Sequence, residues 1–115
     1  MTVTIWHNPK CSTSRKVLEI IRARGIEPKI VDYVNVPPSV AVITAALKAM
    51  GMTPRDLLRR RGTPYDDLGL DNNHLSNAAL IEAMHMHPIL IERPVVLSPK
   101  GTRLCRPAET VEVLL

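Results

Sequence analysis

The pattern of apolar and polar residues at the start of the chain predicts a strand, a helix and a second strand. Residues 2–7 alternate and are rich in β-branched side chains, which is typical of a strand. Apolar residues then recur at helical spacing until Gly25, and Ser12 or Thr13 can cap this helix. Lys29–Val34 predicts the second strand, so we expect the N-terminal part of the chain to form a β-α-β unit.

The middle of the chain carries the signals of several short helices. Ser39, Thr53 and Ser76 each precede a helix-forming stretch and can act as caps. The second of these helices begins with a proline, a favoured first residue, and we expect it to continue to about Gly62. We therefore expect a helical insert over about residues 38–87.

Strand signals return in the C-terminal part of the chain. Arg93–Leu97 predicts a strand, residues 98–101 a turn, and residues 102–105 the partner strand of a hairpin. Residues 107–115 predict a final short helix. The order β-α-β, helical insert, β-β-α predicts an α/β fold with a small mixed sheet covered by helices, in a single domain over residues 1–115.

The composition narrows the classes of partner. Apolar residues make up 45% of the chain and charged residues 23%, an ordinary balance for a globular protein. There is no Phe, and only 3% of the residues are aromatic, so stacking on nucleic-acid bases is poorly supported. No apolar stretch is long enough to span a membrane, and the N-terminus lacks the pattern of a signal peptide. We therefore expect a cytoplasmic protein that binds neither nucleic acid nor membrane.

The two cysteines, Cys11 and Cys105, are expected to be reduced in the cytoplasm. A zinc site needs further ligands, and the histidines do not stand at a spacing that supplies them. We expect no metal site. Cys105 lies on an apolar predicted strand, which favours a packed thiol.

Cys11 stands at the junction of the first predicted strand and helix, where several roles are open to a cysteine. It can be a small packed side chain, half of a disulfide, a metal ligand or a reactive thiolate. At a helix N-terminus, backbone N–H groups lack partners and the helix dipole is positive, which stabilises a thiolate. Arg15 can add to this effect. The hydroxyls of Ser12, Thr13 and Ser14 lie where the same N–H groups would bind an oxyanion.

The residues around Cys11 also limit its redox chemistry. Ser14 occupies the position that would complete a Cys-x-x-Cys pair, so the loop cannot run a dithiol cycle by itself. A disulfide of Cys11 therefore needs an outside thiol or the distant Cys105. His7 has two open roles: it can hold the thiolate electrostatically when protonated, or it can simply complete the strand.

Five segments of the chain carry a resemblance to a known family. They read HNPKCSTSR, EPKIVDYVNVPPS, LLRRRGTPYDDLGL, HPILIERPVV and GTRLCRP, and their order and spacing match over nearly all of the chain. The chain is thus identified as similar to the arsenate reductase (ArsC) family that draws electrons from glutathione and glutaredoxin. The resemblance implies a thioredoxin-like fold with a helical insert, which agrees with the predicted order of elements.

The resemblance also implies roles for particular residues. Cys11 corresponds to the cysteine that attacks arsenate, and Arg59, Arg93 and Arg106 correspond to three arginines that hold the oxyanion. Arg60 adjoins the first of these arginines and is the alternative if the register shifts by one residue. The peptide bond that follows Arg93 corresponds to the cis-proline bond of thioredoxin-like proteins.

The expected function is reduction of arsenate to arsenite, with glutathione as co-substrate, glutaredoxin as partner and no bound cofactor. A second redox scheme would have Cys105 resolve Cys11, with thioredoxin regenerating the pair. Two alternatives lie outside this activity. One is a thioredoxin-like transcriptional regulator that binds RNA polymerase, and the other is an orphan thiol reductase that acts on another oxyanion.

Overall fold

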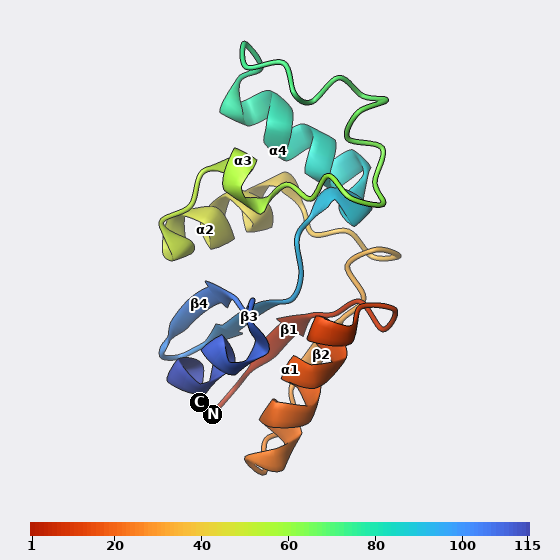
Figure 1. Cartoon of the computed structure of the whole chain (residues 1–115). Helices are drawn as coiled ribbons and strands as arrows, with labels where there is room; N and C mark the ends of the chain where they lie inside the picture. The colour runs from red at the N-terminus through yellow and green to blue at the C-terminus, as the bar shows by residue number, and fades with distance from the viewer. The chain divides into compact units, whose positions relative to one another are not determined.

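The computed structural model describes residues 1–115, and the chain divides into two compact units (Figure 1). The first unit combines Met1–Val36 with Arg93–Leu115, and the second is Pro37–Glu92. The second unit is therefore an insertion in the sequence of the first, with limits close to those of the predicted helical insert. That both units belong to a single domain stays a prediction.

The first unit is built on a four-stranded sheet in the order β2-β1-β3-β4. Its strands are β1 (Thr4–Trp6), β2 (Lys29–Val31), β3 (Val95–Ser98) and β4 (Gly101–Leu104). The central strand β1 runs parallel to β2 and antiparallel to β3, and β3 and β4 form an antiparallel hairpin. The predicted mixed sheet is therefore confirmed.

Helix α1 (Ser12–Ala23) makes the crossover that joins the parallel strands β1 and β2. The short helix predicted near the C-terminus is the 3₁₀ helix η2 (Ala108–Leu114), which packs against α1. Both helices lie against one face of the sheet (Figure 1, orange and blue ribbons). The core of this unit consists of Val3, Ile5 and Val96 of the sheet segments, Val17, Leu18 and Ile21 of α1, Ala108, Val111 and Leu114 of η2, and also Cys105 and Leu115.

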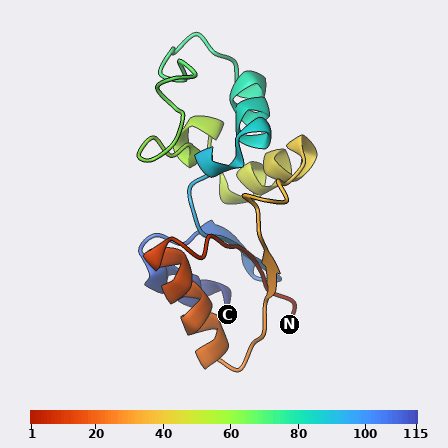
Figure 2. The same ribbon diagram turned by 90° about the vertical axis from the view of Figure 1, so that its right-hand side faces the viewer.

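The second unit is helical, as predicted. It contains α2 (Val40–Met50), α3 (Pro54–Leu57), α4 (Asn77–Met86) and the 3₁₀ helix η1 (Pro88–Leu90). Helix α4 packs against the other three (Figure 2). The three predicted caps are present, since the side chains of Ser39, Thr53 and Ser76 each accept a hydrogen bond from a backbone N–H of their helix. No helix in the protein combines the length and the apolar character needed to cross a membrane.

The prediction that α3 continues well beyond Leu57 is wrong. Leu58 is extended and forms an isolated antiparallel bridge with Ile91. The N–H of Arg59 donates to the carbonyl of Leu90 over 2.7 Å, so it is not available to the helix. A contact between distant parts of the sequence therefore ends the helix where local preference would have let it continue.

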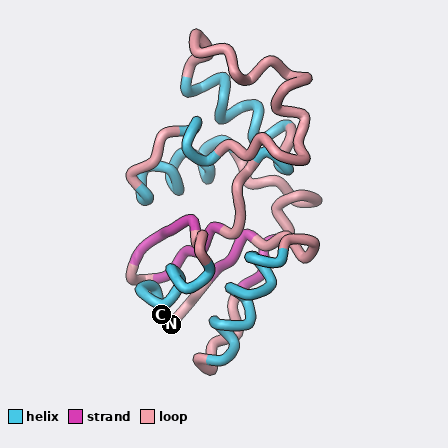
Figure 3. The backbone as a smooth tube through the Cα atoms, in the orientation of Figure 1, coloured by secondary structure: helices cyan, strands magenta, loops and turns pink.

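A long segment without regular structure joins α3 to α4 (Figure 3, pink). Arg55 of α3 holds it in place through three hydrogen bonds. Its guanidinium donates to the hydroxyl of Tyr65 and to the carbonyls of Leu70 and Asn72, over 3.1, 2.9 and 3.1 Å. These contacts fix the loop that follows the Arg59–Arg61 run.

Ile21→Ala is expected to lower the free energy of unfolding by about 2–5 kcal/mol, because it leaves a cavity in a close-packed core. The Ile21 side chain is 0% exposed and belongs to the core of the first unit. Ile30→Ala is the matched control, since Ile30 is 42% exposed on the edge strand β2 and should lose about 1 kcal/mol or less. Urea unfolding followed by circular dichroism measures both, and equal losses would contradict this account of the core.

Candidate active site

The loop between β1 and α1 is organised by Asn8, a residue that is 5% exposed. Its backbone N–H donates to the hydroxyl of Ser14 over 3.1 Å, and its side-chain oxygen accepts from the N–H of Lys10 over 3.0 Å. Its carbonyl accepts from the N–H of Cys11 over 3.0 Å. The sequence analysis missed Asn8, although an Asn-Pro pair is a turn signal that could have marked it.

The prediction that Ser12 or Thr13 caps α1 is wrong, since both residues lie within the helix. The N-cap residue is Cys11, which lies at the junction of strand and helix as predicted. Its backbone is extended, with φ −95° and ψ 122°, and its carbonyl accepts the first helical hydrogen bond, from the N–H of Arg15 over 3.0 Å. The side chain is partly exposed and its thiol is free. The first turn of α1 contains no acidic residue, so no carboxylate there opposes a negative charge on the sulfur.

The pKa of Cys11 lies below the ordinary value for a thiol. Burial of the sulfur acts in the opposite direction and raises the pKa, but four other groups outweigh it. These are the backbone N–H groups of Ser14 and Thr13 and the side chains of Arg106 and Arg93. A thiolate stabilised in this way is a nucleophile, and the donors that stabilise it also suit an approaching oxyanion.

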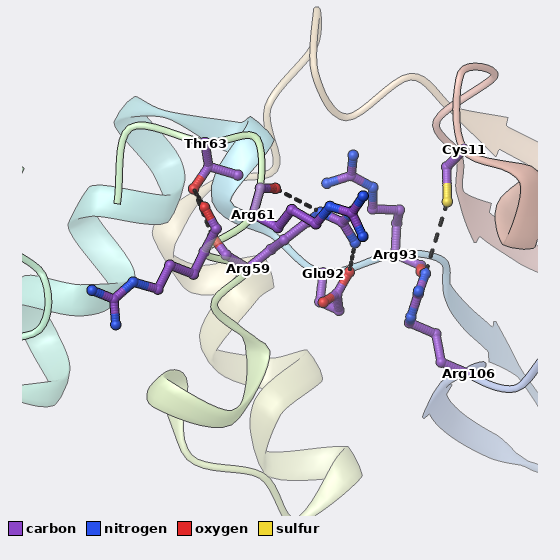
Figure 4. A network of polar contacts seen from close by, with 8 residues as sticks. Cys11, Arg59, Arg61, Thr63, Glu92, Arg93 and Arg106 are labelled. Atoms are coloured by element: carbon purple, nitrogen blue, oxygen red, sulfur yellow. Dashed lines mark hydrogen bonds and ion pairs between the residues drawn. The ribbon is translucent and has the colours of Figure 1, made fainter. Parts of the chain in front are cut away.

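Arg106 lies in direct contact with this sulfur. Its Nη1 lies 3.8 Å from Sγ of Cys11 and also donates to the carbonyl of Arg93 over 3.1 Å (Figure 4). The first unit therefore brings together three of the predicted site residues, Cys11, Arg93 and Arg106. The Arg93–Pro94 peptide bond is cis, as the resemblance implies, and so is the bond between Arg106 and Pro107.

His7 and Ser14 form a buried pair behind the loop. Nδ1 of His7 lies 2.7 Å from the hydroxyl oxygen of Ser14, and both residues are buried. Burial lowers the pKa of His7, the positive charge of Arg22 adds to this effect, and Asp32 opposes it. Of the two roles left open for His7, the one that requires a protonated ring is therefore disfavoured.

Arg15, the third supporting residue expected beside the thiol, makes its hydrogen bond elsewhere. Its Nη1 donates to the carbonyl of Pro9 over 2.8 Å, so the side chain reaches back from α1 to the loop that precedes Cys11. Arg15 therefore braces the loop that carries the thiol.

Arg59 belongs to the second unit, where two groups hold its side chain. Nε donates to the carbonyl of Arg61 over 3.0 Å, and Nη1 donates to Oε1 of Glu92 over 2.9 Å (Figure 4). Sequence analysis missed Glu92, because no local pattern signals a partner 33 residues away. The role of Arg59 in binding an anion stays a prediction.

Arg60, the alternative to Arg59, has different surroundings. It forms an ion pair with Asp66, and its guanidinium carbon lies 5.0 Å from the centre of the Tyr65 ring. Its side chain is 61% exposed, whereas that of Arg59 is 21% exposed. Arg59 is therefore the more firmly enclosed of the two.

Cys105 contrasts with Cys11. Its side chain is buried, and burial raises its pKa to about 12, with a small opposing effect from the positive charge of Arg103. This thiol therefore stays protonated at any physiological pH. No group of three or more His, Cys, Asp or Glu side chains is arranged to hold a metal ion.

Comparisons with known proteins agree with the resemblance seen in the sequence. Residues 6–114 match the family model described as "ArsC family". An arsenate reductase of Rhizobium meliloti is 53% identical over 111 residues, which cover 96% of this chain and 79% of that protein. An arsenate reductase of Escherichia coli strain K12 is 47% identical over 113 residues, covering 98% of this chain and 80% of that protein.

The fold agrees as well. The solved structure of an arsenate reductase from Vibrio cholerae superposes on this protein with a TM-score of 0.95 at 39% sequence identity. The superposition covers 100% of this chain and 98% of the Vibrio cholerae chain. The α/β, thioredoxin-like fold with a helical insert, expected from the sequence, is therefore confirmed.

Arg106→Ala is expected to raise the pKa of Cys11 toward the ordinary thiol value, because a positive group beside the sulfur is lost. The thiolate is the form that iodoacetamide alkylates, and its fraction increases as the pH rises through the pKa. The rate of alkylation plotted against pH should therefore shift to higher pH, with a slower reaction near neutral pH and an unchanged alkaline plateau.

Arg103→Ala is the matched control for this experiment, since Arg103 acts on Cys105 and not on Cys11. Mass spectrometry of the alkylated peptides keeps the two cysteines apart. An unchanged pH profile in Arg106→Ala would contradict a role of Arg106 in stabilising the thiolate.

Proposed function

Because the chain belongs to the ArsC family, we propose that it is an arsenate reductase that uses the Cys11 thiolate as its nucleophile and glutathione and glutaredoxin as electron donors. The observation that carries the proposal is the lowered pKa of Cys11, at the N-terminus of α1 and 3.8 Å from Arg106. The relatives that bear the name arsenate reductase, which match the chain over most of its length, support the choice of substrate.

In the proposed binding step, arginines meet the charge of arsenate. Arginine suits this role because its planar guanidinium donates paired hydrogen bonds to oxyanions and stays charged at any working pH. Arg93 and Arg106 stand beside the thiol in the first unit. Arg59 completes the set by its correspondence to the third arginine of the family.

The first chemical step forms a bond between sulfur and arsenic. The Cys11 thiolate attacks the arsenic atom, and an arsenate oxygen leaves as water after taking up protons. Arsenic remains pentavalent in this thiol–arsenate ester, so no electron has yet been transferred. Backbone N–H groups at the start of α1 stabilise the thiolate before the attack.

Reduction follows when glutathione enters. Its thiolate attacks the Cys11 sulfur, the sulfur–arsenic bond breaks, and the electron pair of that bond passes to arsenic, which leaves as trivalent arsenite. Cys11 is left in a mixed disulfide with glutathione. A glutaredoxin thiol then attacks the glutathione sulfur and releases the Cys11 thiolate. Because thiols supply both electrons, the scheme requires no bound cofactor or metal.

The surroundings of the two cysteines favour an external electron donor. Cys105 is buried with a pKa of about 12, so it supplies almost no thiolate to attack Cys11. Ser14 stands where a second loop cysteine would be, and its hydroxyl is engaged by His7 and Asn8. These two facts also weigh against the thioredoxin-linked scheme and against a regulator with a Cys-x-x-Cys switch. A cytoplasmic location, where glutathione keeps thiols reduced, is part of the proposal.

Cys11→Ser is expected to abolish arsenate-dependent oxidation of NADPH in an assay with glutathione, glutathione reductase and glutaredoxin, because serine forms no sulfur–arsenic bond.

Arg93→Ala is expected to lower kcat/KM for arsenate in the same assay by roughly 10- to 100-fold, the loss that follows removal of a charged hydrogen-bond donor. Wild-type protein with a reactive low-pKa Cys11 but no turnover of arsenate would reject this substrate, and other oxyanions would then be assayed.

Cys105→Ala is expected to keep at least half of the wild-type turnover, because glutathione and not Cys105 is proposed to attack Cys11. The same coupled assay measures this rate, and a urea titration checks that the buried substitution leaves the protein folded. Loss of turnover in a folded variant would support the scheme in which Cys105 resolves Cys11.

A further inference from the structure

The ion pair between Arg59 and Glu92 is held in place by the backbone on both sides. The N–H of Arg59 donates to the carbonyl of Leu90 over 2.7 Å, and the N–H of Glu92 donates to the carbonyl of Leu57 over 2.8 Å. These bonds flank the antiparallel bridge that joins the two segments. The two side chains therefore start from fixed backbone positions, and their contact does not depend on flexible loops.

The side chains themselves are well defined. Each is 21% exposed, and the guanidinium is held at Nε by the carbonyl of Arg61 and at Nη1 by the carboxylate of Glu92. The neighbouring pair of Arg60 and Asp66 is far more exposed, at 61% and 64%. An ion pair shielded from water interacts more strongly than an exposed one, so Glu92 offsets more of the positive charge of Arg59 than Asp66 offsets for Arg60.

We propose that Glu92 is a positioning residue that orients the Arg59 guanidinium and competes with the substrate oxyanion for its positive charge. This inference rests on the proposed function, in which Arg59 binds arsenate. Nη2 of Arg59 donates to neither of its two partners, so the anion can be bound through this nitrogen while Nε and Nη1 remain held. The carboxylate then lies near the bound anion and repels it.

The competition between Glu92 and the anion distinguishes the substrate from the product during turnover. Arsenate is negatively charged at neutral pH, whereas the reduced product is arsenous acid, which is uncharged. Arsenate therefore competes with Glu92 for the positive charge of Arg59, whereas the neutral product does not. Because its negative charge opposes arsenate and not the neutral product, Glu92 keeps arsenate binding weaker than the arginines alone would make it.

Two substitutions separate orientation from competition. Glu92→Gln keeps an oxygen that accepts the hydrogen bond from Nη1 but removes the negative charge. It is expected to lower the KM for arsenate by roughly three- to tenfold with kcat within about twofold of wild type. The fall in KM should grow as the pH rises and arsenate loses a further proton. Glu92→Ala removes both the charge and the hydrogen bond, and its KM is expected to lie above that of Glu92→Gln.

Asp66→Asn is the matched control, since it removes the carboxylate from the exposed ion pair of the adjacent arginine. Its KM and kcat should equal those of wild type. An unchanged or higher KM in folded Glu92→Gln would overturn the competition, and equal KM values for the Gln and Ala variants would overturn the orienting role.

The affinity for arsenate is also measured without turnover, from the arsenate concentration that halves the rate of Cys11 alkylation. Glu92→Gln should lower this concentration by the same factor as the KM. Arg59→Ala separates the inference from the function on which it rests. If it leaves both values unchanged, Arg59 does not bind arsenate and that part of the proposed function fails. If it raises them while Glu92→Gln changes neither, the inference about Glu92 alone fails.

Discussion

The chemistry of the thiol depends on the packing of α1 against the sheet, because this packing fixes the position of the N-terminus of the helix. Val17, Leu18 and Ile21 bury one face of α1 and leave its first turn at the end of the loop from β1. The unpaired N–H groups of that turn then act on a single sulfur, that of Cys11. A helix free to shift along the sheet would not hold these donors in place, and the pKa of the thiol would return toward its ordinary value.

Backbone carbonyls hold three of the arginines that the sequence predicts at the site. Arg15 donates to the carbonyl of Pro9, Arg106 to that of Arg93, and Arg59 to that of Arg61. Each contact fixes a flexible side chain before a ligand arrives, so less conformational entropy is lost when an anion binds. A carbonyl is well suited to this task because it orients a guanidinium without neutralising its charge. Glu92 differs in this respect, since its carboxylate orients Arg59 and also offsets its charge.

The two cysteines show how one residue type acquires opposite properties. Cys11 is partly exposed at a helix N-terminus beside arginine, and its pKa is lowered. Cys105 is buried in the apolar core of the same unit, and its pKa is raised to about 12. The difference confines thiolate chemistry to one position, which supports the proposal that the second thiol comes from outside the protein.

The sequence by itself determined the elements whose signals are local. These signals act within a few residues, so the sequence predicts them correctly. They are the side-chain caps at Ser39, Thr53 and Ser76, the alternation that predicts β1, and the place of Cys11 before α1. Only the tertiary structure decided what depends on distant segments. The bridge between Leu58 and Ile91 ends α3 early and sets Arg59 beside Glu92, and the approach of Arg106 to Cys11 spans 95 positions of the chain. Such contacts arise because burial and hydrogen bonding are satisfied across the whole fold, and no local preference encodes them.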